Sequence, residues 1–113
     1  MKKVFCLVVT AAIIVIGCSK SNDPVGTGLD CSTPKSFAND VNPIIQSSCA
    51  LTGCHASGSN NGPGALTTYQ QVFDHRTSIR NAVASGAMPK NGSLTTAQKN
   101  AVLCWIDSGA PNN

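Results

Sequence analysis

Six cysteines in a chain of 113 residues restrict the fold more than any other feature of this sequence. Two of them, Cys49 and Cys54, are separated by four residues, and His55 follows the second one directly. A cysteine pair that ends in Cys-His suits the covalent attachment of a haem, because two thioethers hold the porphyrin edge and the histidine reaches the iron. The more common motif, Cys-x-x-Cys-His, has a shorter spacer. The motif predicts one covalent haem c, attached at Cys49 and Cys54, with His55 as the proximal axial ligand.

The first 17 residues have the pattern of a bacterial lipoprotein signal peptide. Two lysines precede an apolar or small-residue run over residues 4–16. This run is too short for a helix that spans a membrane, which takes about 20 residues. Residues 15–18 resemble a lipobox, in which the cysteine is lipidated and becomes the mature N-terminus. We expect Cys18 to carry lipid that holds the chain on a membrane surface; the alternative is an ordinary secretory signal with an incidental Cys18.

Removal of the signal peptide leaves a nearly neutral chain. The full sequence has eight Lys and Arg against five Asp and Glu, and loss of Lys2 and Lys3 leaves six against five, a net charge of +1. No basic stripe with interleaved aromatic residues remains, so we exclude a nucleic-acid partner. Residues 18–30 have the composition of a flexible linker. We expect a signal peptide (1–17), a lipidated N-terminus with linker (18–30) and one folded domain (31–113).

Four cysteines remain after Cys6 leaves with the signal peptide and Cys18 takes the lipid. They are Cys31, Cys49, Cys54 and Cys104. The compartment outside the inner membrane is oxidising, so without a cofactor these four allow three disulfide pairings. If haem takes the two motif cysteines, the remaining pair is Cys31 with Cys104. A disulfide there contributes about 4 kcal/mol on the chain-entropy account.

Two other uses of the motif stay open at this stage. One is a zinc site, which takes four ligands. The candidates are Cys49, Cys54, His55 and His75. Adjacent Cys54 and His55 are awkward ligands for one tetrahedral ion. The other is a small disulfide loop between Cys49 and Cys54, which would make the chain a disulfide-stapled lipoprotein interaction module without haem.

The spacing of apolar residues predicts an all-α domain, because no segment alternates with period two and several have helical spacing. Residues 37–49 have apolar side chains three and four positions apart, which predicts a helix that presents Cys49 to the core. Pro43 either begins a second helix after Asn42 or kinks the first. Residues 56–64, rich in Ser, Asn, Gly and Pro, predict a loop.

Two capping boxes mark the starts of two further helices. Thr68 with Gln71 opens a short helix through residue 73, and Thr95 with Gln98 opens a final helix that ends near residue 108. A short helix between them ends near residues 85–86, where a glycine can terminate it. The final helix should have one apolar side, formed by Ala101, Val102, Trp105 and Ile106.

The loop before the final helix offers a second iron ligand. Met88 precedes Pro89, whose ring restricts the backbone before it to extended geometry, so the thioether is held in place. Thioether sulfur is a soft ligand that suits haem iron, and pairing it with histidine raises the reduction potential. We predict Met88 as the distal axial ligand. The alternative sixth ligand is His75. Without a haem, Met88 would be a core residue that fills a gap between apolar side chains.

These residues resemble the class I cytochrome c family, in particular the small single-haem domains of exported bacterial proteins. The similarity lies within residues 37–111, in segments 40–45, 49–55, 87–89, 94–95 and 105–110. The resemblance implies a compact all-helical fold wrapped around one covalent haem. It also implies attachment at Cys49 and Cys54, with His55 as the proximal ligand and Met88 as the distal ligand.

The expected function is the transfer of single electrons. His55 and Met88 on the two faces of the iron would leave no position for oxygen or a substrate. The sequence has no Ser/His/Asp arrangement and no phosphate-binding glycine loop, so we do not expect an enzyme. We expect a membrane-anchored c-type cytochrome that serves redox proteins of the bacterial cell envelope. Its place would be the outer membrane, at the periplasmic or the outer face.

Overall fold

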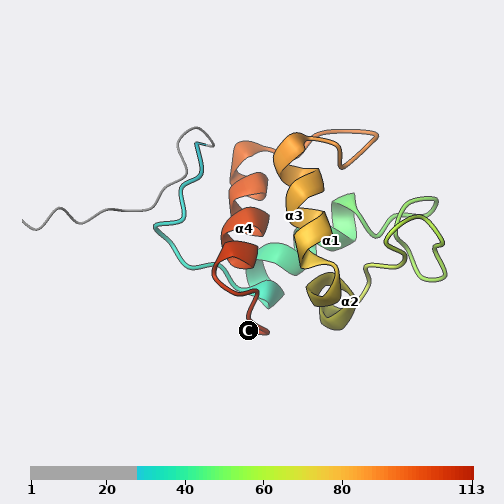
Figure 1. Cartoon of the computed structure of the whole chain (residues 1–113), viewed down its shortest axis with the longest axis horizontal. Coiled ribbons are helices and arrows are strands. Elements are labelled where there is room, and N and C mark those ends of the chain that lie inside the picture. Colours follow the sequence, from blue (N-terminus) through green and yellow to red (C-terminus); the bar gives the residue numbers. More distant parts are fainter. Residues whose placement is uncertain (1–27) are drawn as a thin grey trace, which may run out of the picture.

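The structure is a computed structural model that describes residues 28–113. The predicted signal peptide, Cys18 and most of the predicted linker lie outside the described residues. Residues 28–113 form helices and loops without a β-strand, so the all-α prediction is confirmed for this part (Figure 1). The elements in chain order are η1 (Phe37–Val41), α1 (Asn42–Ser48), α2 (Tyr69–Asp74), α3 (Arg76–Ser85) and α4 (Thr96–Asp107). None of these helices is long and apolar enough to cross a membrane.

The first helical segment changes its hydrogen-bonding pattern at Asn42. The π-helical stretch η1 ends with the Asn42 N–H bonded to the carbonyl of Phe37, and α1 follows without a break. Pro43 stands in the first turn of α1, where its missing N–H costs no hydrogen bond. Pro43 therefore begins a new helix, the first of its two predicted effects.

Local capping signals set the ends of the other helices. Thr68 and Gln71 form a complete capping box at the start of α2, and Thr95 and Gln98 form another at α4. Gly86 ends α3 with φ of 76°, a left-handed conformation that suits a residue without Cβ. The predicted helix starts and stops are confirmed at these positions, which also places the loop that carries Met88 directly after α3.

Helix α4 is the centre of the core and is buried on more sides than its sequence pattern predicts. The pattern predicts one apolar side, but every residue from 101 to 106 is buried. η1 and α3 both pack against α4, and the segment before η1 covers Cys104. The prediction of a one-sided helix was wrong because three separate segments surround α4.

Three aromatic side chains gather where η1, α2 and α4 meet. The ring centroid of Phe37 lies 5.1 Å from that of Tyr69 and 5.4 Å from that of Trp105. The Tyr69 hydroxyl donates a hydrogen bond to the Ala110 carbonyl at 2.9 Å, and Trp105 Nε1 donates to the Pro111 carbonyl at 2.9 Å. The large rings are therefore packed with their polar atoms satisfied, and they hold the C-terminal segment in place.

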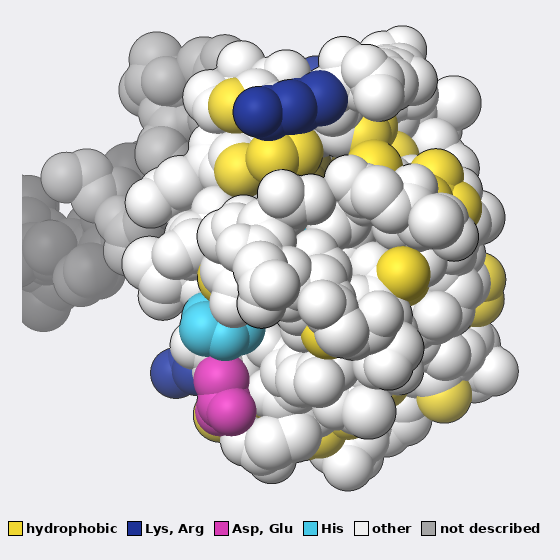
Figure 2. Space-filling view, turned by 90° about the vertical axis from the view of Figure 1, so that its right-hand side faces the viewer, with side chains coloured by type: hydrophobic (Ala, Val, Ile, Leu, Met, Phe, Trp, Pro, Cys, Tyr) yellow, Lys and Arg dark blue, Asp and Glu magenta, His cyan; other side chains and the backbone are white. Residues whose placement is uncertain are grey.

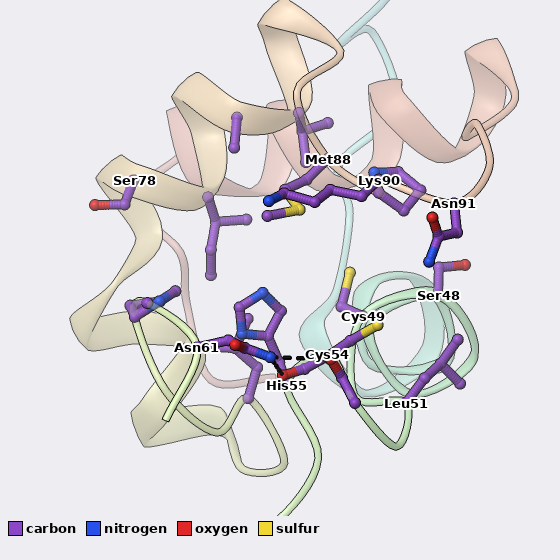
Figure 3. A pocket seen from close by; sticks show the side chains of 18 residues that line it. Ser48, Cys49, Leu51, Cys54, His55, Asn61, Ser78, Met88, Lys90 and Asn91 are labelled. Atoms are coloured by element: carbon purple, nitrogen blue, oxygen red, sulfur yellow. Dashed lines mark hydrogen bonds between the residues drawn. The ribbon is translucent and has the colours of Figure 1, made fainter. Parts of the chain in front are cut away.

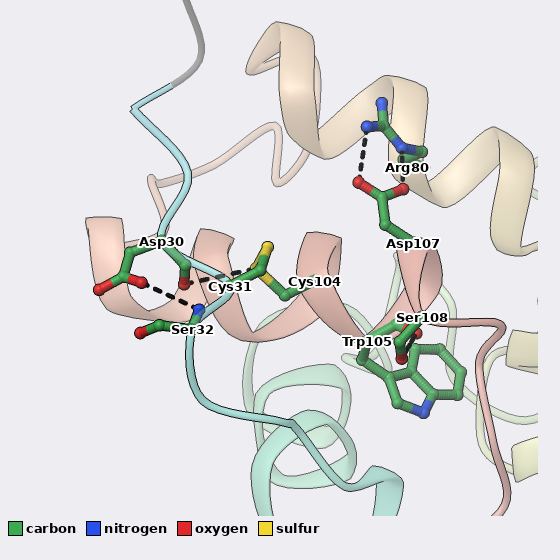
Figure 4. The surroundings of a disulfide bond; sticks show 8 residues. All are labelled: Asp30, Cys31, Ser32, Arg80, Cys104, Trp105, Asp107 and Ser108. Carbon is green, nitrogen blue, oxygen red and sulfur yellow. Dashed lines mark hydrogen bonds and ion pairs between the residues drawn. A yellow bond between two sulfur atoms is a disulfide. The ribbon is translucent and has the colours of Figure 1, made fainter. Parts of the chain in front are cut away.

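A disulfide and an ion pair join α4 to its neighbours (Figure 4). Cys31 and Cys104, 73 positions apart, form the disulfide that the cysteine count predicts once the motif cysteines are set aside. It fastens the segment before η1 to α4. Arg80 of α3 forms a bidentate pair with Asp107 of α4, with N–O distances of 2.5 and 2.8 Å. Both side chains are about one third exposed, so this pair contributes at most about 1 kcal/mol.

Removal of the disulfide should lower the stability of the domain. Replacing both Cys31 and Cys104 with serine should reduce the free energy of unfolding by about 4 kcal/mol, because the unfolded chain regains the entropy of a long closed loop. Denaturant unfolding followed by circular dichroism measures the loss. Arg80→Ala is the comparison variant, with an expected loss below about 1 kcal/mol. Equal losses in the two variants would contradict the prediction.

Candidate functional site

A cavity of about 720 Å³ lies between α3 and the loop that follows α1. This volume is within the range of about 300–1,000 Å³ typical of ligand and cofactor sites. The buried apolar side chains Leu66, Ile79 and Val83 form part of its wall, and the exposed side chains of Lys90 and Asn91 also line it. The cavity therefore suits a group with a large apolar body and a polar edge.

All four side chains predicted to hold a haem line this cavity (Figure 3). Cys49 stands at the C-terminal end of α1, Cys54 and His55 lie in the loop that follows, and Met88 lies in the loop after α3. In Figure 3 the His55 ring and the Met88 side chain enter the cavity from opposite sides, with the two thiols on one flank. The fold thus brings residues from three segments to one site.

His55 is held so that one of its ring nitrogens is available to a metal. The side chain is only 6% exposed, and Nδ1 lies 2.8 Å from the Gly64 carbonyl oxygen. A carbonyl oxygen only accepts hydrogen bonds, so Nδ1 carries the proton and Nε2 keeps a free lone pair. Among residues 28–113, Nε2 has no hydrogen-bond partner. Proteins orient metal-binding histidines through such a bond to a backbone carbonyl, so His55 fits the role of an iron ligand.

The four-residue spacer folds into a compact turn. The Cys54 N–H donates to the Leu51 carbonyl at 2.9 Å, and the His55 N–H donates to the Cys49 carbonyl at 3.0 Å. Gly53 has φ of 81°, a left-handed conformation that favours glycine. The second hydrogen bond spans the whole motif, so it returns the chain to Cys49 despite the longer spacer.

Cys49 and Cys54 are half-buried free thiols in this structure. Burial raises the pKa of Cys49 above its ordinary value, because the thiolate loses hydration, and the neighbouring Cys54 raises it further. The small disulfide loop of the alternative interpretation is not formed here. In this arrangement each sulfur has no bonded partner among residues 28–113.

The two candidates for the sixth ligand, Met88 and His75, differ in their position relative to the cavity. Met88 lines the cavity, and its N–H donates to the Ala82 carbonyl at 3.1 Å, which fixes the start of this loop against the end of α3. His75 stands at the junction between α2 and α3 and does not line the cavity. The geometry favours Met88 as the residue opposite His55.

The loop over residues 56–64 makes contacts that the sequence analysis did not assign. The side chains of Ser59 and Asn61 both donate hydrogen bonds to the Cys54 carbonyl. The composition of the segment predicts a loop, as observed, but it does not indicate which backbone groups the loop would contact. These partners depend on the path by which the loop returns to the motif.

The zinc alternative finds no ligand set in the part of the chain that the structure describes. Residues 28–113 contain no group of three or more His, Cys, Asp or Glu side chains placed to hold a metal ion. A porphyrin brings four nitrogen ligands of its own, so the protein supplies only one ligand to each face. His55 and Met88 both line the cavity and carry donor atoms of the kinds that bind haem iron.

No family model, no curated protein and no solved structure matches the chain.

The buried Cys49 thiol should ionise at a higher pH than an exposed thiol. The test uses cofactor-free protein with Cys54→Ser, in which burial alone still disfavours the Cys49 thiolate. The rate at which iodoacetamide alkylates Cys49 should increase with pH, and the midpoint of this increase should lie at a higher pH than for an exposed thiol. Mass spectrometry of samples quenched at each pH measures the rate. The same variant in denaturant is the control and should return to the ordinary midpoint. Identical folded and denatured profiles would contradict the prediction.

Proposed function

We propose that this chain is a c-type cytochrome that carries single electrons through one covalently bound haem c. The observation that carries the proposal is that Cys49, Cys54, His55 and Met88 line one cavity of about 720 Å³. Their roles are those implied by the resemblance to the class I cytochrome c family. The all-helical fold of residues 28–113 is consistent with that family.

The chain offers a separate group for each bond that the cofactor needs. Cys49 and Cys54 would attach the porphyrin edge, while His55 Nε2 and Met88 Sδ would bind the iron from opposite faces. When bound, haem iron supplies a centre that gains and loses one electron. The bond from Nδ1–H of His55 to a backbone carbonyl fixes the tautomer of the neutral ring and orients Nε2.

The walls of the cavity support a relatively high reduction potential. Leu66, Ile79 and Val83 are each less than a tenth exposed and form an apolar boundary against water. A low-dielectric environment disfavours the more highly charged oxidised centre, and a thioether ligand acts in the same direction. Ligation on both faces leaves no position for a substrate, so we propose a carrier without enzymatic activity of its own.

We also propose that the protein is lipid-anchored through Cys18 in the bacterial cell envelope and exchanges electrons there with other redox proteins. In Figure 1 the described N-terminal segment lies on the side of α4, and the loop that follows α1 lies at the opposite side of the domain. The face that carries this loop has few charged side chains, and those stand near its edges (Figure 2). Such a face suits brief contacts with partner proteins that do not depend on strong charge pairing.

Covalent haem attachment is the first test. The full chain expressed in a host with a haem-attachment system should be red, show a Soret band and keep its haem after denaturation. The double variant Cys49→Ala/Cys54→Ala is the control, and any haem it binds should be released on denaturation, because no thioether can form. A colourless wild-type protein would contradict the proposal and favour the disulfide-stapled interaction module.

The identity of the distal ligand is tested by substitution at Met88. Met88→Ala should abolish the weak iron–sulfur absorption band of the oxidised protein, and Met88→His should lower the reduction potential, because a second histidine replaces the thioether. His75→Ala is the matched control and should leave both properties unchanged, since His75 does not line the cavity. A wild-type protein without this band, whose reduction potential changes in His75→Ala and not in Met88→Ala, would reverse the assignment.

A further inference from the structure

The four residues between Cys49 and Cys54 affect how precisely the Cys54 thiol is positioned. Cys49 is the C-cap residue directly after α1, and its N–H donates to the Ile45 carbonyl, so the end of the helix holds its backbone. Cys54 comes five positions later, after four intervening residues in a turn, where each additional residue has conformational freedom that must be lost before the thiol points one way. The turn holds the N–H groups of Cys54 and His55, and a side chain from the following loop holds the carbonyl groups on both sides of the Cys54 Cα atom.

Asn61 holds the backbone on both sides of Cys54. Its Nδ2 group donates to the Gly53 carbonyl at 2.9 Å and to the Cys54 carbonyl at 3.0 Å. The first carbonyl belongs to the peptide before the Cα atom of Cys54, and the second belongs to the peptide after it. Because peptides are planar, fixing both of them fixes the direction of the bond from Cα to Cβ. Asn61 thereby helps to set the direction of this bond, from which the thiol of Cys54 extends.

Ser59 supports the same arrangement. Its hydroxyl donates to the Cys54 carbonyl, and its oxygen accepts the Asn61 N–H at 3.2 Å. The two contacts made by Asn61 need a group with two N–H donors on one nitrogen. Aspartate has nearly the same shape but only acceptor oxygens, so it would repel both carbonyls. The contact is therefore specific to the amide.

We infer that Asn61 is a positioning residue for attachment at Cys54, an inference that rests on the proposed haem attachment. In that step the Sγ–H of Cys54 adds across a vinyl group of the porphyrin. The S–H bond and the vinyl π bond break, an S–C bond forms, and the thiol hydrogen ends on the neighbouring vinyl carbon, with no net oxidation or reduction. Addition needs Sγ close to one carbon, and Asn61 supports this by holding the backbone from which the side chain extends. Without Asn61 a larger share of the chains would be joined through Cys49 alone.

The experiment counts the thiols left free in haem-bearing protein. The full chain and its variants Asn61→Ala, Asn61→Asp and Asn60→Ala are expressed with a haem-attachment system, denatured and alkylated with iodoacetamide, and mapped by mass spectrometry. Asn60 is the matched control, because it is an exposed neighbour whose side chain makes no hydrogen bond among residues 28–113. Both Asn61 variants should show a severalfold larger share of haem-bearing chains alkylated at Cys54. Asn60→Ala should match the wild type.

The possible outcomes distinguish this inference from the proposed function. Wild-type protein without covalent haem contradicts the proposed function itself. Covalent haem in the wild type, with the same share of free Cys54 in both Asn61 variants, overturns the inference alone. If an Asn61 variant retains too little haem to map, the alkylation rate of Cys54 in the haem-free protein decides instead. That rate should exceed the wild-type rate, and an unchanged rate overturns the inference.

Discussion

The hydrogen bond between His55 Nδ1 and the Gly64 carbonyl decides which atom the cavity presents to a ligand. It assigns the proton to one ring nitrogen and leaves the other with a lone pair. The bond depends on the backbone at Gly64, whose φ of 108° is a conformation that glycine adopts readily and that strains other residues. Gly64, nine positions after His55, thus favours one tautomer of the imidazole. The polar loop between these two residues is part of the site.

The helix ends could be predicted from the sequence because their causes are local. The capping boxes at Thr68 and Thr95 involve side chains three positions apart, and Gly86 ends α3 through its own backbone freedom. Residue chemistry also singled out His55 and Met88, since few side chains suit iron. Their convergence on one cavity depends in addition on how the segments that carry them pack together.

Features set by chain paths through space could not be predicted in this way. The burial of Leu103 and Cys104 depends on segments that pack on α4 from far away in the sequence. The folded turn of the spacer has only Gly53 as a local signal, and the contacts of Asn61 require the loop to double back on the motif. Composition identifies such a segment as a loop, but tertiary structure chooses its partners.

The disulfide also determines where mechanical force enters the domain. Cys31 is bonded to Cys104, whose side chain is 5% exposed on the helix at the centre of the core (Figure 4). A pull on residues 28–30 is therefore passed through a covalent bond to α4, and it bypasses Ser36 and the short stretch η1 that Ser36 caps. Under tension applied at residues 28–30, the load therefore enters the domain at Cys104 of α4, and η1 lies outside that path.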